Sequence, residues 1–220
     1  MITVHQGIFL HRSSFSLNTQ RHSFLTRDQG VLKAISFNRG KITNPLVLQE
    51  CEIIIKTDPK FEFPTLQSMV PKASPEDLSI PPIELFVRYF VADIIHQTIA
   101  QKSDEAQAYD FLGLAKTKMK KESELYSFPT WFLNGWIHVL GIQPIGNPGA
   151  NDLKVEQGEF ILSMTKNPAA QAWNRLILEA KPVEKSSQKE LVNLMLFYLS
   201  KHTPNLNVSK TLEIINQTLH

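Results

Sequence analysis

Four prolines stand within twelve residues, at positions 71, 75, 81 and 82, and they separate two parts of the chain that differ in apolar pattern. Proline cannot donate to a β-ladder and is disfavoured inside a helix, so neither kind of element continues through this segment. Short β-type runs precede the prolines, and a helical apolar spacing follows them. We therefore predict a domain at residues 1–75, a proline-rich linker at 76–82 and a second domain at 83–220.

The first part has the pattern of a small β-barrel. We predict five strands, at residues 4–12, 19–26, 31–37, 46–56 and 65–70. The segment Arg27-Asp28-Gln29-Gly30 predicts the hairpin turn between the second and third strands, because Gly30 can take a positive φ. Five short strands in this length are typical of an OB-fold, although an SH3-like barrel fits the same strand count.

The second part is predicted to be an α-helical domain, which makes the whole chain α+β. The clearest helix begins at residue 83, where apolar residues at 83, 86, 87, 90, 91, 94 and 95 share one face. Further helices are predicted at 103–121, at 129–140 with Gly141 as its C′ residue, and from 168 with Asn167 as its cap. A capping box of Ser187 and Glu190 predicts a helix at 191–201, and Ser209 one that ends at 219. The longest irregular loop is expected at 141–152.

Enzyme signatures are missing from the sequence. The Gly40-Lys41 pair does not complete a phosphate-binding loop, because Ile35 and Ile42 occupy the positions that require Gly and Ser or Thr. The histidines are too scattered for metal-ligand spacing, and the single cysteine, Cys51, lies in an alternating run where it is expected to be a small buried hydrophobe. We predict no catalytic residue, no metal and no cofactor.

The composition favours the cytoplasm. No apolar run has the length of a membrane-spanning helix, and no signal-peptide cleavage pattern follows the first residues. One cysteine cannot form a disulfide framework within the chain, which fits a reducing compartment.

Positive charge is concentrated at the front of the chain. Residues 1–50 carry six basic and two acidic side chains, a net charge of +4, whereas the remaining residues carry 17 basic and 19 acidic ones, a net charge of −2. Such asymmetry indicates either a polyanionic partner such as nucleic acid or a solvated basic surface.

Several short segments, in order along nearly the whole chain, form a recognisable series of motifs. The segments in the barrel region are Gly7-Ile8-Phe9-Leu10-His11-Arg12 and Phe24-Leu25-Thr26 with Gly30. Those in the helical region are Trp131-Phe132-Leu133, Leu140-Gly141-Ile142-Gln143-Pro144, Asp152-Leu153 with Glu159-Phe160, and Tyr198, His202 and Pro204 with Lys210-Thr211-Leu212-Glu213. In this order and spacing, the segments resemble proteins of the RecO family of DNA-repair factors.

The resemblance implies an N-terminal OB-fold, a helical C-terminal domain, and binding to single- and double-stranded DNA with strand annealing and no nucleotide hydrolysis. It also implies two protein partners, RecR and the acidic C-terminal tail of single-strand DNA-binding protein, with which the family loads recombinase at gaps. A cytoplasmic, nucleoid-associated location follows. The chain departs from the family in three places: Ser16-Leu17-Asn18 replaces a Gly-Glu-Thr/Ser segment, Asn38 replaces a glycine, and Ser200 replaces an arginine beside Lys201.

Two sets of binding residues are predicted. The hypothesised DNA-contacting residues are Arg12, Arg21, Arg27, Lys33, Arg39 and Lys41, which meet phosphates, and Phe37, which stacks on a base. The hypothesised contacts of the acidic tail are Lys116, Lys120, Lys201 and Lys210, although a lysine-rich helix face is by default a solvated one. The alternative function is an adaptor that bridges RecR and single-strand DNA-binding protein without binding DNA, for which the altered Ser16–Asn18 loop is an argument.

Overall fold

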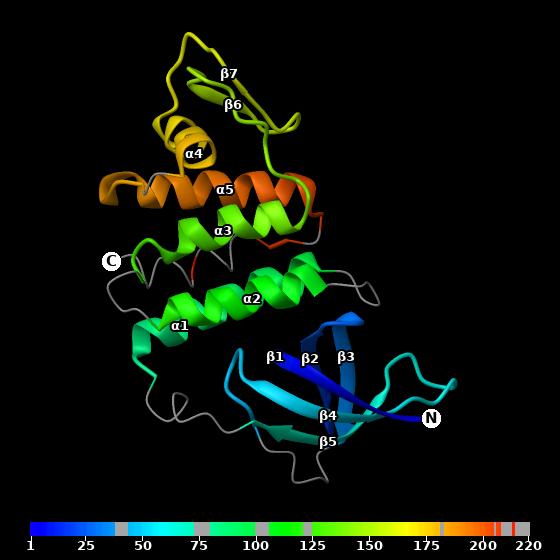
Figure 1. Cartoon of the computed structure of the whole chain (residues 1–220). Coiled ribbons are helices and arrows are strands. Elements are labelled where there is room, and N and C mark those ends of the chain that lie inside the picture. The colour runs from blue at the N-terminus through cyan, green and yellow to red at the C-terminus, as the bar shows by residue number, and fades with distance from the viewer. Residues whose placement is uncertain are drawn as a thin grey trace. The chain divides into compact units, whose positions relative to one another are not determined.

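The computed structural model describes residues 1–37, 44–72, 80–99, 106–120, 125–180, 183–204, 206–207 and 213. These residues divide into two compact units, Met1–Lys116 and Thr117–His220. The first unit holds a β-barrel and two helices, and the second holds the remaining helices and a small hairpin (Figure 1). Most of the predicted linker lies outside the described residues, so the domain boundaries at 75 and 83 stay predictions.

The barrel consists of five strands in the order of an OB-fold. They are β1 (Ile2–Ser16), β2 (Thr19–Thr26), β3 (Gly30–Phe37), β4 (Glu50–Lys56) and β5 (Thr65–Pro71). The closed order is β1-β2-β3-β5-β4, with β4 antiparallel to β1 and β3 parallel to β5. This Greek-key closure of five strands is that of an OB-fold, so the predicted α+β class is confirmed. Gly30 has a φ of 58° in the predicted turn.

The barrel interior is filled by side chains that alternate along each strand. Phe9 of β1 lies opposite Phe24 of β2, which lies opposite Leu32 of β3, and all three are buried. Gly7 stands on the same inner face, where an added Cβ would come within 2.7 Å of Ile53 Cδ1. A larger residue at this position would force the buried Ile53 side chain to shift, because β1 passes close to the packed core.

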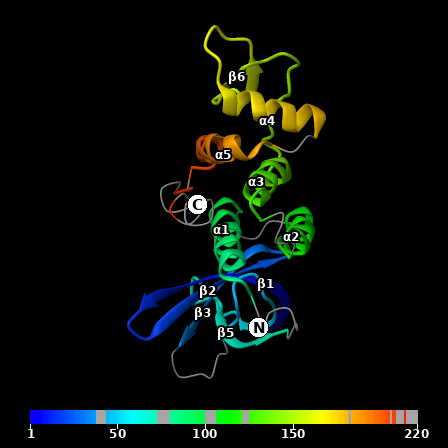
Figure 2. The same ribbon diagram turned by 90° about the vertical axis from the view of Figure 1, so that its left-hand side faces the viewer.

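Two helices complete the first unit. They are α1 (Pro82–Thr98), which packs on β1, and α2 (Ala106–Met119), which crosses into the second unit by its last residues. The predicted apolar face of α1 is buried from Val87 onward, whereas Ile83 and Phe86 remain exposed. The predicted ends of α2, at 103 and 121, lie outside the described residues. Figure 2 shows the hairpin of β1 and β2 extending beyond the rest of the barrel.

The second unit contains α3 (Phe128–Val139), β6 (Asp152–Lys154), β7 (Glu159–Ile161), α4 (Pro168–Glu179), the short 3-10 helix η3 (Lys185–Ser187) and α5 (Gln188–His202). α5 contacts both α3 and α4. Asn167 caps α4 as predicted, accepting a hydrogen bond from Ala170 N at 3.2 Å, and Gly141 follows α3 with a φ of 69°. The hairpin of β6 and β7 follows the predicted irregular loop, where no strand was expected.

The predicted capping box at the start of α5 is wrong. Ser187 makes no side-chain capping hydrogen bond, because it belongs to η3 and has helical backbone angles. The first residue of α5, Gln188, instead makes two hydrogen bonds through its buried side-chain amide. It accepts from Thr130 Oγ1 at 2.6 Å and donates to the Val183 carbonyl at 2.9 Å. α5 therefore begins three residues before the predicted 191. The helix predicted from Ser209 to 219 falls outside the described residues, apart from residue 213.

Two residues of the family-like tail have structural contacts within the second unit. Tyr198 Oη donates to the Ile142 carbonyl at 2.6 Å, and His202 Nε2 lies 3.0 Å from the Val155 carbonyl. Ile142 belongs to the loop before β6, and Val155 to the turn between β6 and β7, so α5 holds both the loop and the hairpin. The Tyr198 hydroxyl also lies close to Gly158: a Cβ added to that glycine would come within 2.8 Å of Tyr198 Oη.

Candidate nucleic-acid interface

A β-bulge decides which side chains of the first three strands face outward. β1 pairs with β2 as Phe9 opposite Phe24 and then as His11 opposite Ser23, which leaves Leu10 as an extra residue in β1. A bulge of this kind re-aims every side chain that follows it. Because Phe24 faces the interior and side chains alternate, two cross-strand rows point away from the interior: His11, Ser23 and Lys33, and then Ser13, Arg21 and Ile35. Ser23 and Ile35 are nevertheless buried.

Arg21 lies against a pair of aromatic rings on this outer face. Its guanidinium carbon lies 5.9 Å from the ring centroid of Phe15 and 6.0 Å from that of Phe63. The two rings pack edge to face at 5.9 Å. Phe15 belongs to the end of β1 and is 51% exposed, and Phe63 belongs to the loop before β5. Cation–π contact therefore orders an arginine and an aromatic surface side by side.

Cationic side chains of neighbouring strands, Arg21 of β2 and Lys33 of β3, gather on the same face. Burial and, next, the charge of Arg21 lower the pKa of Lys33. Among the described residues, no carboxylate lies within ion-pair distance of Arg21 or Lys33. Two like charges held close together without neutralisation leave a positive potential, which an anion such as a phosphate relieves.

A histidine pair extends this cationic face to α1. The rings of His11 and His96 stack with centroids 5.2 Å apart. Burial lowers the pKa of His96 to about 4, and the charges of His11, Lys33 and Arg21 act in the same direction, against Asp93. The His96 ring is therefore uncharged near neutral pH, and the neighbouring cations oppose its protonation.

The other predicted DNA contacts lie elsewhere. Arg12 is one residue out of step with the outer rows: it pairs with His22, whose side chain is buried, and its guanidinium donates to Asn44 Oδ1. Arg27, in the turn after β2, forms an exposed ion pair with Asp110 at 3.0 Å. Phe37 ends β3 and is 52% exposed. Arg39 and Lys41 lie outside the described residues.

The lysines predicted to contact an acidic tail lie at α2, on α5 or outside the described residues. Lys116 belongs to the first unit and lies 3.3 Å from Glu50 Oε1. Lys120 and Lys201 belong to the second unit, where Lys201 Nζ lies 5.2 Å from the ring centroid of Phe197. Lys210 lies outside the described residues. The acidic-tail site therefore stays a prediction.

The single cysteine is buried in the barrel, as predicted. Cys51 is 0% exposed, and burial, with the nearby Glu50 carboxylate, raises the pKa of its thiol to about 12. A thiol in this state is a packing group, because the thiolate is the nucleophilic form. Within the described ranges, no three His, Cys, Asp or Glu side chains form a group that could hold a metal ion. No helix in the described part of the chain is long and apolar enough to cross a membrane.

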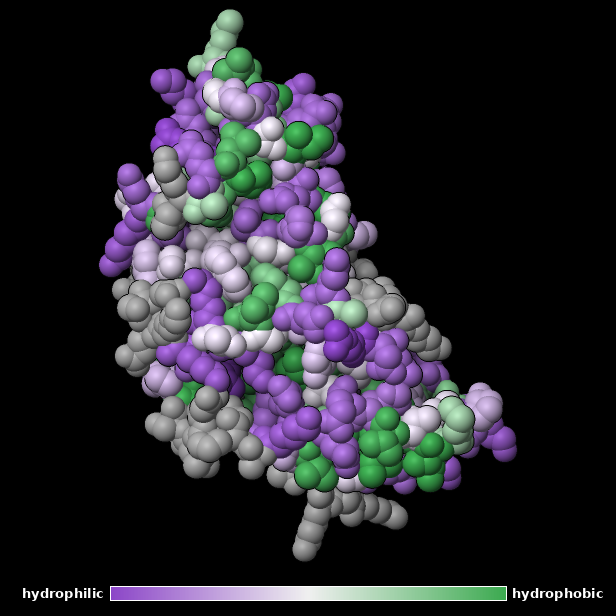
Figure 3. Space-filling model, viewed as in Figure 1, coloured by the Kyte–Doolittle hydropathy of each residue, from purple (hydrophilic) through white to green (hydrophobic). Residues whose placement is uncertain are grey.

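The sequence analysis named Phe37 but missed Phe15 and Phe63, the two aromatic residues beside Arg21. Figure 3 shows hydrophobic side chains at the barrel surface among hydrophilic ones, and the exposed phenylalanines of the barrel are Phe15, Phe37 and Phe61. The one available signal was the segment Phe61-Glu62-Phe63-Pro64, where two aromatic residues stand in a proline-containing loop. No protein-family model matches the chain, and no curated protein matches it.

Proposed function

We propose that this chain is a non-enzymatic DNA-binding protein of the RecO type, which binds single- and double-stranded DNA through its barrel and anneals complementary strands. The observation that carries the proposal is the contact of Arg21, on the outer face of β2, with the packed rings of Phe15 and Phe63. OB-folds bind oligonucleotides on the face of strands 2 and 3 and with the loops after strands 1 and 4. Phe15 and Phe63 stand beside those two loops.

The chemistry of this face suits a single strand. Exposed rings stack on bases without regard to sequence, and cations beside the rings neutralise the backbone phosphates. Arg21 and Lys33 supply such cations from neighbouring strands, and the lowered pKa of Lys33 is restored when a phosphate approaches it. Binding of this kind is sequence-tolerant and weakens as salt concentration rises.

Annealing follows from binding alone, because base pairing supplies the driving force once phosphate repulsion is screened. In this proposal RecR and the acidic tail of single-strand DNA-binding protein are the protein partners, and the joint task is to load recombinase onto coated gaps in the cytoplasm, on the nucleoid. The family resemblance supports these partners.

One observation favours the alternative, an adaptor that bridges RecR and single-strand DNA-binding protein without touching DNA. Two of the predicted phosphate contacts already have partners in the chain, Arg12 with Asn44 and Arg27 with Asp110. Measuring DNA affinity without partner proteins separates the two functions.

The test is fluorescence anisotropy of a labelled oligothymidylate at low salt. The Phe15→Ala and Arg21→Ala proteins should bind more weakly, by roughly 5- to 150-fold for each lost stacking platform. Arg21→Ala should also reduce the slope of log affinity against log salt by about 0.7. Arg175→Ala, which removes an exposed arginine of α4 in the second unit, is the matched control and should bind as the parent does. If the parent chain shows no binding, or if Arg21→Ala changes neither affinity nor slope, the proposal fails.

A further inference from the structure

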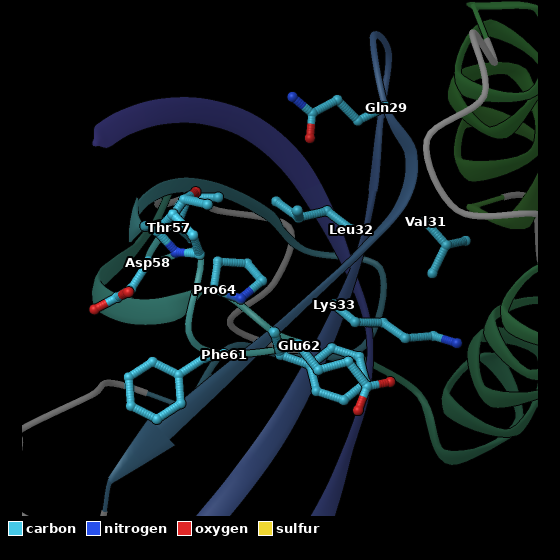
Figure 4. A pocket seen from close by; sticks show the side chains of 12 residues that line it. Gln29, Val31, Leu32, Lys33, Thr57, Asp58, Phe61, Glu62 and Pro64 are labelled. Atoms are coloured by element: carbon cyan, nitrogen blue, oxygen red, sulfur yellow. The ribbon is translucent and has the colours of Figure 1, made fainter.

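A pocket of about 230 Å³ opens beside the cationic face, between β3 and the loop at residues 57–64 (Figure 4). Its origin is the strand pairing. β3 and β5 pair only at Ile35 and Thr65, so the earlier residues of β3 have no strand beside them on that side. The loop that leads into β5 lies over this gap and leaves a hollow between itself and the strand.

The edge of β3 lines this pocket with backbone polar groups. Ile35 N donates to the Pro64 carbonyl at 2.9 Å, which fixes the direction of its N–H toward β5. Strand alternation then directs the N–H and C=O groups of Val31 and Lys33 to the same side. Both residues line the pocket, and neither makes a further backbone hydrogen bond on that side within the described residues.

The walls are apolar and partly aromatic. Leu32 and Ile55 form the inner wall, and Phe61, Phe63 and Pro64 form the wall on the loop. Phe61 is 58% exposed, so its ring is available to a ligand. The volume lies below the ~300–1,000 Å³ of pockets that hold drug-sized ligands, which suits a single nucleobase.

Polar side chains stand at the ends of the pocket. Figure 4 shows Gln29 on the β2–β3 turn, Asp58 and Thr57 on one side, and Lys33 on the other. Asp58 Oδ1 accepts a hydrogen bond from Lys60 N at 3.0 Å and so holds the loop. The side chains of Gln29 and Glu62 have no hydrogen-bond partner among the described residues.

These charges separate the two parts of a nucleotide. The carboxylates of Asp58 and Glu62 repel a phosphate, which is attracted instead to Lys33 and Arg21 on the outer face. A base enters the pocket best if its edge presents N–H donors to a carboxylate. Guanine presents two adjacent donors, N1–H and the N2 amino group, and a carboxylate can accept both. Thymine presents a single N–H between two carbonyl oxygens, which a carboxylate repels.

The geometry points to a base-reading pocket: the hollow between β3 and the loop at 57–64 takes one unstacked base of a single strand, with guanine preferred over thymine through Glu62. The inference rests on the proposed DNA-binding function and adds a base preference to it. A base inside a duplex cannot enter, because it must first leave the stack. The preference therefore belongs to single strands alone.

The test compares three labelled oligonucleotides by anisotropy: an oligothymidylate, the same strand with one central guanine, and the same strand with hypoxanthine in that place. The guanine strand should bind roughly ten-fold more tightly than the oligothymidylate, the usual scale for a bidentate base contact. The hypoxanthine strand lacks the N2 amino group and should lose part of that gain. Glu62→Gln should abolish the gain, because an amide presents one acceptor and one donor in place of two acceptors.

Glu52→Gln is the matched control, since Glu52 is an exposed glutamate of β4 that does not line the pocket. It should keep the full guanine preference. If all three strands bind equally, or if Glu62→Gln keeps the preference, the base-reading pocket is refuted while DNA binding stands. If none of the strands binds, the proposed function fails and the pocket inference with it.

Discussion

The buried His22 should make the barrel unstable in mild acid. Its side chain is 1% exposed, Nε2 lies 2.9 Å from Ser36 Oγ, and Nδ1 is buried without a hydrogen-bond partner among the described residues. Burial, and next the charge of Arg12, lower its pKa from 6.5 to about 4. The unfolded chain therefore binds a proton between these two pH values that the folded barrel does not.

The sign and size of the effect follow from proton linkage. A histidine with a lowered pKa in the folded state contributes its full stability above about pH 6.5 and loses it as the pH falls toward 4. The loss in free energy of unfolding amounts to about 2 kcal/mol at pH 5 and to about 3 kcal/mol near pH 4. His96 acts with the same sign, because its pKa is also lowered to about 4, so a substitution is needed to isolate His22.

The measurement should report on the barrel alone. Met69, buried in β5, carries a methyl group whose folded and unfolded NMR signals in urea give the barrel's free energy of unfolding. The drop between pH 7 and pH 5 should be about 2 kcal/mol smaller in His22→Phe than in the parent. Ser36→Ala keeps the histidine, so it should lower stability by about 1 kcal/mol at both pH values and keep the pH dependence. An equal pH dependence in the parent and His22→Phe would refute the reasoning.

Three further predictions concern packing, an ion pair and the thiol. Gly158→Ala should destabilise the second unit by about 2 kcal/mol, because Gly158 has a φ of 65° and the added Cβ would meet Tyr198 Oη. Urea unfolding followed by tryptophan fluorescence measures this loss. The control is Gly113→Ala, at a position of α2 with open space around it, which should not destabilise the chain. A double-mutant cycle of Arg27→Ala and Asp110→Ala should give a coupling below about 1 kcal/mol, because both side chains are exposed, and a larger value would contradict the surface placement. Cys51 should resist a disulfide reagent at pH 8 in the folded chain and react fully in urea; rapid labelling of the folded chain would contradict its burial and raised pKa.

Local patterns predicted the strands and helices better than they predicted the contacts between them. β2 was predicted to the residue, because alternation and the turn at Gly30 are both local signals. The barrel order was an expectation from strand number, since pairing β1 with β4 joins residues far apart in sequence. The β6–β7 hairpin was missed because strands of three residues are too short to show a period.

The candidate site was predictable only as a charge excess. Six basic residues near the N-terminus were treated alike, and the structure places Arg21 and Lys33 on one outer face while Arg12 faces the other way. The bulge in β1 causes this difference, and no local sequence rule marks its position. Phe15 and Phe63 were missed for a related reason: they are far apart in the sequence, and only the barrel brings them together beside Arg21.

The extra residue in β1 makes this surface depend on where along the strand the chain changes length. Removing Leu10 would close the bulge and keep Phe9 opposite Phe24 and His11 opposite Ser23. Removing a residue beyond the bulge, such as Arg12, would instead bring Ser13 into register with His22 and Ser14 with Arg21, and would turn the rest of β1 to the opposite face of the hairpin. Homologous chains that each lack one codon of the first strand would therefore present the same charges or different ones according to the position of the loss, and alignments scored by residue identity alone would overlook the difference.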